Sequence, residues 1–164
     1  MKFNATAQYP ADVHTIRALL VDPEFTKFRL AKAGVEASSI ESVEADGGVR
    51  LTIVVPVSGD MVPANYRRFV PSSLSATLVE HWHPVAGDRS PTGVMSMEFS
   101  GVPARARSDF RLTETGETSE RVFDGELSVS IPLVGKAIEQ KAVGMLERLV
   151  RAESKAAAEF LAHP

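Results

Sequence analysis

The fold is decided by residues 132–161, which read PLVGKAIEQKAVGMLERLVRAESKAAAEFL. Apolar side chains recur at the spacing that an α-helix of 100° per residue places on one face. These are Val134, Ile138, Ala142, Met145, Leu149, Ala152, Ala156 and Phe160, widened on one side by Leu146, Val150 and Ala157. A helix of this length spans about 45 Å. Because burying its large side chains contributes roughly 1.5–3 kcal/mol apiece, the helix needs a partner surface of similar length.

The chain before this helix alternates between apolar and polar residues, which is typical of half-buried β-strands. We expect strands at 2–8, 35–45, 49–57, 74–82, 93–100, 104–113 and 121–131, and two short helices that begin at Val13 and Pro23. Residues 46–48, Asp-Gly-Gly, favour a tight hairpin because glycine adopts positive φ at little cost. Residues 58–71 form the longest irregular piece and are a candidate lid.

Six successive strands joined mostly by short turns favour an antiparallel sheet. One face of this sheet is apolar, so it is expected to curl around the terminal helix. We predict a single α+β domain over 1–164 in the order strand, two helices, six strands, helix. A curved sheet of about seven strands would wrap around the C-terminal helix and enclose an internal cavity.

Composition excludes several classes of function. The formal net charge is −3, and Arg67-Arg68 is too short to be the basic stripe of a nucleic-acid-binding protein. The absence of cysteine excludes disulfides and thiolate metal sites, and it fits a cytoplasmic protein. No apolar run approaches transmembrane length, so stable membrane insertion is not expected.

Several short motifs resemble a known group of proteins. Residues 9–12, Tyr-Pro-Ala-Asp, followed by 19–25, LLVDPEF, resemble the START/Bet v 1-like helix-grip superfamily, which includes polyketide cyclases and lipid- or hormone-binding proteins. Residues 46–49, 80–82, 125–127 and 130–135 are similar to the DUF2505 branch of that superfamily. The resemblance covers essentially the whole chain. It implies a helix-grip fold with a cavity and no particular activity, because this fold hosts enzymes, carriers and regulators alike.

Glu80 is the polar residue with the greatest chemical interest, because alternation places it between Leu78 and Trp82 on the inward face. A carboxylate there would have a raised pKa, and it could act as a general acid or base or hold a polar ligand group. The alternative is that Glu80 lies at the rim of the sheet or pairs with an arginine. Glu153 falls within the apolar sector of the long helix, where it would either contact a ligand or mark the point at which the sheet ends.

An apolar pocket between sheet and helix would be lined by inward-facing side chains. The expected ligand-binding residues are Glu80, Trp82, Met95, Met97, Phe99, Ser108, Phe110, Met145 and Leu149. Methionines suit such a pocket because they adapt to irregular shapes. The same residues could equally fill a closed core.

No motif names a catalytic residue, a cofactor or a metal. His81 and His83 share a strand face, but a metal would need a third ligand, and Asp88 is the only local one.

Our leading hypothesis is therefore the binding of a small hydrophobic or amphipathic molecule, such as a lipid or polyketide. The alternative is a cyclase-, dehydratase- or hydrolase-like enzyme that uses Glu80, assisted by Ser108 or Tyr66. A third hypothesis is an interaction module, and the sequence also allows a homodimer.

Overall fold

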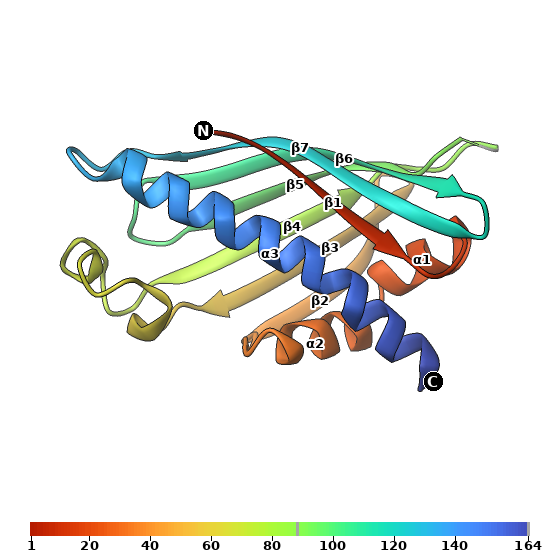
Figure 1. Ribbon diagram of the computed structural model, residues 1–164, viewed down its shortest axis with the longest axis horizontal. Coiled ribbons are helices and arrows are strands. Elements are labelled where there is room, and N and C mark those ends of the chain that lie inside the picture. Colours follow the sequence, from red (N-terminus) through yellow and green to blue (C-terminus); the bar gives the residue numbers. More distant parts are fainter. Residues whose placement is uncertain (88, 164) are drawn as a thin grey trace.

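The computed structural model describes residues 1–87 and 89–163, which form a seven-stranded antiparallel sheet and three α-helices (Figure 1). The strands are β1 (Lys2–Tyr9), β2 (Ser39–Ala45), β3 (Gly48–Pro56), β4 (Ser75–Trp82), β5 (Thr92–Phe99), β6 (Ala104–Thr115) and β7 (Thr118–Val129). The helices are α1 (Val13–Leu20), α2 (Pro23–Lys32) and α3 (Gly135–Ala162), and two 3₁₀ turns, η1 (Gly59–Met61) and η2 (Arg67–Phe69), lie between β3 and β4.

The strand order is β1-β7-β6-β5-β4-β3-β2, and all neighbours are antiparallel. Strands β2 to β7 follow one another along the chain, whereas β1 joins the sheet at β7, with Lys2 opposite Glu126 and Tyr9 opposite Ser119. Helices α1 and α2 connect β1 to the strand at the opposite edge. The predicted helix-grip fold is confirmed, with α3 crossing the inner side of the curved sheet (Figure 1).

Local sequence explains where the elements begin and end. Asp12 caps α1 by accepting a hydrogen bond from the Thr15 amide at 2.9 Å, and Asp22 caps α2 by accepting one from the Glu24 amide at 2.9 Å. Strands β6 and β7 are longer than predicted, because Gly116 turns the chain at positive φ and leaves only two residues between them.

Helix α3 packs mainly against β1 and β7, and α2 covers its C-terminal part. The ring of Phe160 sits edge-on to Phe25 and Phe28 of α2, with centroids 5.4 and 5.3 Å away. These aromatic contacts fix the end of α3 in the angle between α2 and the sheet.

The side of α3 that faces the interior differs from the prediction. Met145, Leu149 and Ala152 lie on the predicted buried face but are exposed, whereas Glu153 is buried together with Ala156 and Ala157 of that face. The buried side is thus rotated toward Leu146 and Val150. The physical reason is that Glu153 is held in the interior by charged partners, so an ionic contact and not the apolar stripe sets the rotation of the helix.

Gly93 is a point of close approach in the inner face of the sheet. A Cβ atom added there would lie 2.3 Å from Cζ of Phe110 and 2.4 Å from the carbonyl oxygen of His81. Glycine therefore leaves the room that the buried Phe110 ring occupies on the neighbouring strand.

We predict that Gly93→Ala lowers the free energy of unfolding by about 1–3 kcal/mol, because overpacking forces Phe110 or the backbone to shift. Urea unfolding followed by the fluorescence of Trp82, the single tryptophan, measures the change. Gly59→Ala is the matched control, since its added methyl group meets nothing within 4 Å. Equal effects of the two substitutions would contradict this account of Gly93.

Candidate functional site

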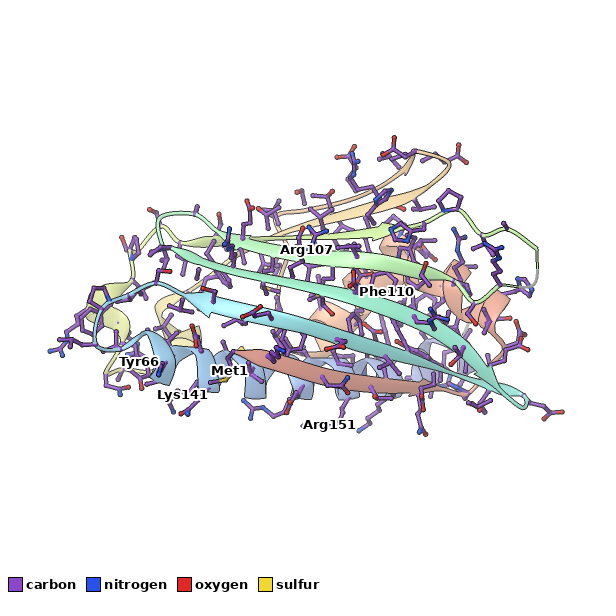
Figure 2. The ribbon with its side chains drawn as sticks, turned by 90° about the horizontal axis from the view of Figure 1, so that it is seen from above. Met1, Tyr66, Arg107, Phe110, Lys141 and Arg151 are labelled. Atoms are coloured by element: carbon purple, nitrogen blue, oxygen red, sulfur yellow. The ribbon has the colours of Figure 1, made fainter. Side chains whose placement is uncertain are left out.

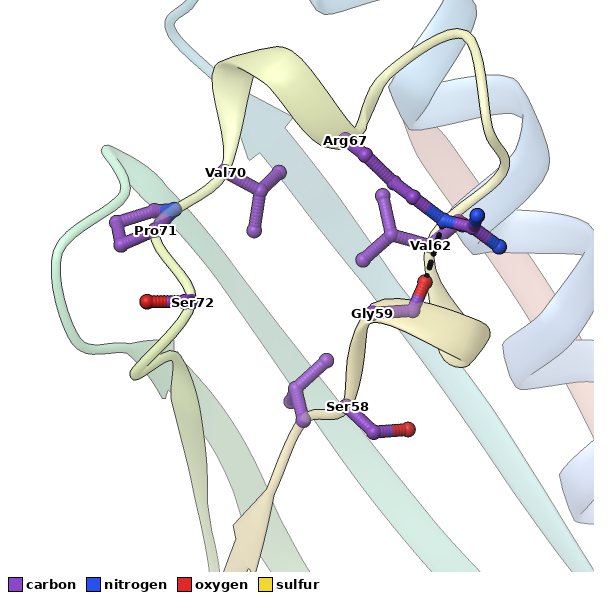
Figure 3. A pocket seen from close by; sticks show the side chains of 8 residues that line it. Ser58, Gly59, Val62, Arg67, Val70, Pro71 and Ser72 are labelled. Atoms are coloured by element: carbon purple, nitrogen blue, oxygen red, sulfur yellow. Dashed lines mark hydrogen bonds between the residues drawn. The ribbon is translucent and has the colours of Figure 1, made fainter.

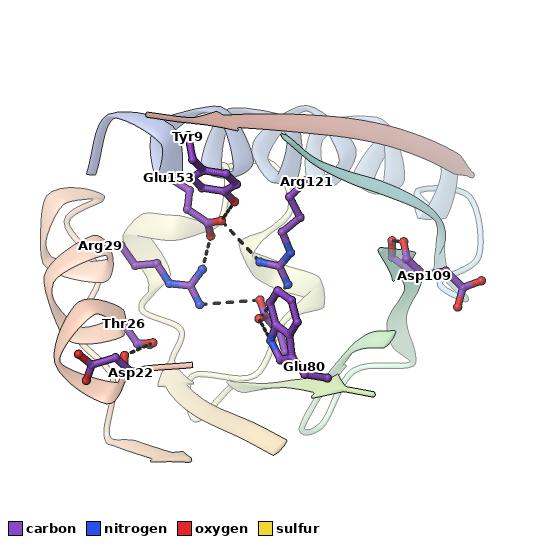
Figure 4. Close-up of polar contacts among 10 residues, drawn as sticks. Tyr9, Asp22, Thr26, Arg29, Glu80, Asp109, Arg121 and Glu153 are labelled. Atoms are coloured by element: carbon purple, nitrogen blue, oxygen red, sulfur yellow. Dashed lines mark hydrogen bonds and ion pairs between the residues drawn. The ribbon is translucent and has the colours of Figure 1, made fainter. Parts of the chain in front are cut away.

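Five polar side chains meet in the interior between the sheet and the helices (Figure 4). They are Tyr9 of β1, Arg29 of α2, Glu80 of β4, Arg121 of β7 and Glu153 of α3, and we call them the ionic cluster. Glu80, Arg121 and Glu153 have only 3, 0 and 8 % of their surfaces exposed. Each member comes from a different element, so the cluster ties three strands and two helices together.

The cluster is formed by alternating charges. Nη2 of Arg121 lies 2.9 Å from Oε2 of Glu80, and Nη1 lies 3.5 Å from Oε1 of Glu153. Nη2 of Arg29 lies 3.7 Å from Oε1 of Glu80. Glu153 also accepts hydrogen bonds from Arg29 and from the hydroxyl of Tyr9. Two guanidinium groups thus neutralise two carboxylates, which buried charges require.

Arg121 is further enclosed by aromatic rings. Its Cζ atom lies 4.1 Å from the ring centroid of Phe110, 4.4 Å from that of Phe123 and 4.8 Å from that of Trp82. No nitrogen of Arg121 makes a well-directed hydrogen bond to a described residue, so the contacts with the glutamates are charge contacts. The guanidinium is stabilised by two carboxylates and by the electron-rich faces of three rings.

The cluster sets the ionisation of its members. Burial favours a raised pKa for Glu80, but Arg121 and Arg29 outweigh it and hold the pKa below its ordinary value. The raised pKa expected for an unpaired inward carboxylate is therefore wrong, and the alternative, in which Glu80 pairs with an arginine, describes the structure. Burial, and then the negative charge of Glu153, raises the pKa of Tyr9 well above its usual 10.0, so the phenol keeps its proton.

In this arrangement Glu80 is not suited to act as a general acid or base. Both oxygens of Glu80 face arginines, and Oε2 also lies 3.4 Å from the indole nitrogen of Trp82, so the carboxylate has no proton to donate. The hydroxyl of Ser108 donates to the carbonyl oxygen of Asp109 at 2.9 Å. Tyr66 lies between β3 and β4, at the end of the molecule where β4 begins, whereas Glu80 is near the end of β4 (Figure 2). The structure does not bring Glu80 and Tyr66 together.

The other residues predicted to bind a ligand fall into two groups. Trp82, Met95, Ser108 and Phe110 are buried around the ionic cluster. Met97, Phe99, Met145 and Leu149 lie farther along the interior and are partly or largely exposed. The predicted set therefore spans a closed end and an open end of the same interior.

The open end is an uncovered apolar region on both sheet and helix. Leu78 and Glu80 share the inner face of β4, and Leu78 pairs with Met97 as Ala76 pairs with Phe99. All four apolar side chains are half-buried, although their inward-facing neighbours nearer to Trp82 are fully buried. On α3, Met145 and Leu149 are 44 and 41 % exposed. We call this region the apolar mouth: Ala76, Leu78, Met97, Phe99, Met145 and Leu149.

Helix periodicity indicates which way Met145 and Leu149 face. Met145, Leu149, Ala156 and Phe160 lie on one stripe of α3, and Phe160 packs against α2. The two exposed residues are on the same stripe but nearer to the start of α3, beyond the part that α2 covers. Met145 and Leu149 therefore point to the same side of α3 that α2 covers near the C-terminal end of the helix.

Two surface pockets lie outside the ionic cluster. One has a volume of about 200 Å³ and is formed by the segment between β3 and β4, with Val57, Val62, Arg67 and Val70 among its walls (Figure 3). It is smaller than the roughly 300–1,000 Å³ of most ligand sites. The other, of about 420 Å³, lies at the β2–β3 turn between Arg17, Glu44 and Asp46. Neither is lined by a residue that the sequence predicts to bind a ligand.

His81 lies on the outer face of β4, and His83 follows the end of that strand. Their rings are edge-on with centroids 5.6 Å apart, and Nδ1 of His83 is 3.1 Å from the hydroxyl oxygen of Thr92. Among the described residues, no three histidine, aspartate or glutamate side chains gather as metal ligands would. Asp88, the third ligand considered from the sequence, lies outside the described residues. No described helix is long and apolar enough to cross a membrane.

Sequence reasoning missed three members of the ionic cluster. Arg121 carried a usable signal, because it shares the inward parity of Phe123, Gly125 and Leu127 on one strand. An inward arginine together with the inward Glu80 would have predicted a buried ion pair. Tyr9 and Arg29 carried no comparable signal, since their partner Glu153 lies more than 120 residues away in the chain.

We predict that Arg121→Met lowers the free energy of unfolding by about 3–5 kcal/mol, because Glu80 would lose its nearest counter-charge inside the protein. The double variant Arg121→Met/Glu80→Met should recover most of this loss, since the pair of Arg29 and Glu153 remains neutral. Urea unfolding measures both variants. Arg107→Met on the exposed outer face is the control and should cost less than about 1 kcal/mol. A double variant as unstable as the single one would refute the charge argument.

Acid should weaken the fold partly through Glu80. Its folded-state pKa lies below the ordinary value of 4.5, so the unfolded chain binds the proton first and stability falls as the pH drops below about 4.5. Glu80→Gln should be the less stable protein at pH 7, and its deficit relative to the wild type should shrink in acid. Unfolding measured from neutral to acidic pH tests this, with Glu126→Gln on the outer face as control. A deficit independent of pH would contradict an ionised Glu80.

Known structures of the same shape are numerous. The protein aligns over 100 % of both chains with the protein TTHA0849 from Thermus thermophilus, at 16 % identity and a TM-score of 0.62. A START superfamily protein from Mycobacterium smegmatis aligns over 97 % of this chain and 98 % of its own, at 13 % identity and a TM-score of 0.58. Ara h 8.0201 aligns over 97 and 98 %, at 12 % identity and a TM-score of 0.54. At these identities the similarity establishes the fold alone.

Sequence comparison identifies the family more narrowly. No curated protein matches the chain significantly. The family model described as "Protein of unknown function (DUF2505)" matches residues 4–161, nearly the whole chain. The protein, which has the START/Bet v 1-like helix-grip fold, therefore belongs to the DUF2505 family.

Proposed function

We propose that the protein binds a small hydrophobic or amphipathic molecule, such as a lipid or polyketide, at the apolar mouth between the sheet and the first half of α3. The observation that carries the proposal is the uneven burial of the inner face. Met97 and Phe99 face inward but stay half-buried, and Met145 and Leu149 are exposed across from the sheet. A bound apolar molecule would cover these side chains and gain about 25 cal/mol for each Å² of apolar surface removed from water.

The ionic cluster defines the inner limit of such a site. Its charges are mutually neutralised, and Trp82, Phe110 and Phe123 surround Arg121. A ligand therefore meets a filled, buried end beyond Leu78 and Met97. The adaptable methionine side chains at the mouth suit ligands of irregular shape.

Similar folds are compatible with this proposal, but it is the exposed apolar surface of this chain that supports it. The alternative of a cyclase-, dehydratase- or hydrolase-like enzyme that uses Glu80 gains no support from the geometry. Glu80 is buried, ionised and occupied by two arginines, and the mouth residues are apolar. A cytoplasmic location and a homodimer stay predictions from the sequence.

Narrowing the apolar mouth should weaken ligand binding without unfolding the protein. We predict that Met97→Trp weakens binding of a solvatochromic apolar dye roughly tenfold or more, because a single misfit methylene in an apolar pocket already changes discrimination about 10–200-fold. Dye titration, and native mass spectrometry of protein purified from its host, measure binding.

Val94→Trp is the matched control, since it places the same side chain on the same strand but on the outer face. Binding by Met97→Trp at the wild-type level, with the wild type holding dye, would locate the dye elsewhere. A wild type that binds neither dye nor any host molecule would overturn the proposed function itself.

A further inference from the structure

The apolar mouth is bordered by positive charge on the helix side. Lys141 and Arg148 lie seven residues apart on α3, hence on one side of the helix, next to Met145 and Leu149. Both are exposed, and neither pairs with an acidic side chain among the described residues. The helix therefore places two free cationic groups beside its uncovered apolar stripe.

The acidic residues of the same part of α3 face away from the mouth. Glu139 accepts a hydrogen bond from the Val129 amide at 3.0 Å and lies 3.7 Å from the amino group of Met1. Glu147 is on the side of Ser154, seven residues later, whose hydroxyl oxygen accepts a hydrogen bond from the Gln8 amide of β1 at 3.0 Å. Both carboxylates are thus directed toward β1 and β7.

The segment between β3 and β4 adds a second pair of cations. Figures 1 and 2 both place this segment at the end of the molecule where α3 begins. Arg67 uses Nε to donate to the carbonyl oxygens of Gly59 and Val62, at 2.8 and 3.0 Å, which leaves its two terminal nitrogens for other partners (Figure 3). Arg68 is exposed and stacks on Phe69. Asp60 is the one carboxylate of this segment.

The closed end offers no comparable attraction for a charged group. Arg29 and Arg121 are already neutralised by Glu80 and Glu153, and all four are buried or nearly so. A charged ligand group placed there would lose its hydration without gaining a free counter-charge. A charged group of the ligand is therefore more stable at the apolar mouth than beside the ionic cluster.

Building on the proposed function, we propose that the ligand is a single-chain amphiphile with one anionic head. Its tail occupies the apolar mouth and points toward the ionic cluster, and its head lies at a basic rim formed by Arg67, Arg68, Lys141 and Arg148. Met145 and Glu153 are separated by about 12 Å along α3, which sets the depth available to the tail. The apolar stripe supplies affinity, and the rim selects the sign of the head.

The test uses four probes with the same alkyl chain, each below its micelle-forming concentration: decanoate, decanol, decyltrimethylammonium and decanedioate. Displacement of a bound apolar dye from the full chain gives relative affinities. We expect decanoate to bind best and decyltrimethylammonium worst. Decanedioate should bind more weakly than decanoate because its second carboxylate would enter the closed end.

Variants identify the rim. Arg68→Gln and Lys141→Gln should each weaken decanoate about two- to fivefold and leave decanol unchanged, as expected for exposed charge pairs. Arg107→Gln, on the exposed outer face of β6, is the control and should change neither. Raising the ionic strength from about 0.01 to about 1 M shortens the Debye length from about 30 to about 3 Å and should reduce the preference for decanoate over decanol.

The outcomes separate this inference from the proposed function. If decanol binds as well as decanoate at low salt, the mouth binds ligands but the rim does not select them, and the inference fails alone. If no probe binds, the proposed function fails as well. Sedimentation of the protein with anionic vesicles, without displacement of dye by decanoate, would also overturn the inference and assign the rim to a membrane surface.

Discussion

The structure depends on keeping one carboxylate, Glu153, inside the protein. The helix that carries it crosses the whole sheet, so the position of this residue fixes how the helix is rotated about its axis. Arg29 and Arg121 neutralise the carboxylate and Tyr9 donates a hydrogen bond to it, while Glu80 neutralises the remaining positive charge. Five elements that are distant in sequence are thereby joined at one point.

This constraint divides the interior into two unlike ends. Around the cluster, Trp82, Phe110 and Phe123 pack tightly against Arg121, and α2 covers the end of α3 through Phe25 and Phe160. Toward the start of α3 no such cover is present on the described part of the chain, and apolar side chains of sheet and helix stay exposed. The interior thus has one closed, tightly packed end around the ionic cluster and one end, toward the start of α3, whose apolar side chains are partly uncovered.

The sequence predicted the elements better than it predicted the site. Alternation and turn residues identified the strands and their antiparallel order, because these depend on local patterns and short connections. The same parity placed Glu80 inside and contained the information that Arg121 is inside too. Local patterns could not identify the partner of each charge. The apolar stripe of α3 predicted that Met145 and Leu149 are buried. In the structure Glu153 is buried instead, because the distant Arg29 and Arg121 neutralise it.

A buried ion cluster usually gives less stability than apolar packing of the same volume, so its value here lies in the geometry that it imposes. An α3 held by apolar contacts alone would rotate to bury Met145 and Leu149 against the sheet, which would remove the apolar mouth. That rotation is opposed because it would draw Glu153 away and leave two buried guanidinium groups with one carboxylate between them. The cluster therefore maintains an uncovered apolar surface that hydrophobic packing would otherwise eliminate, and the proposed ligand would cover that surface without requiring the fold to open.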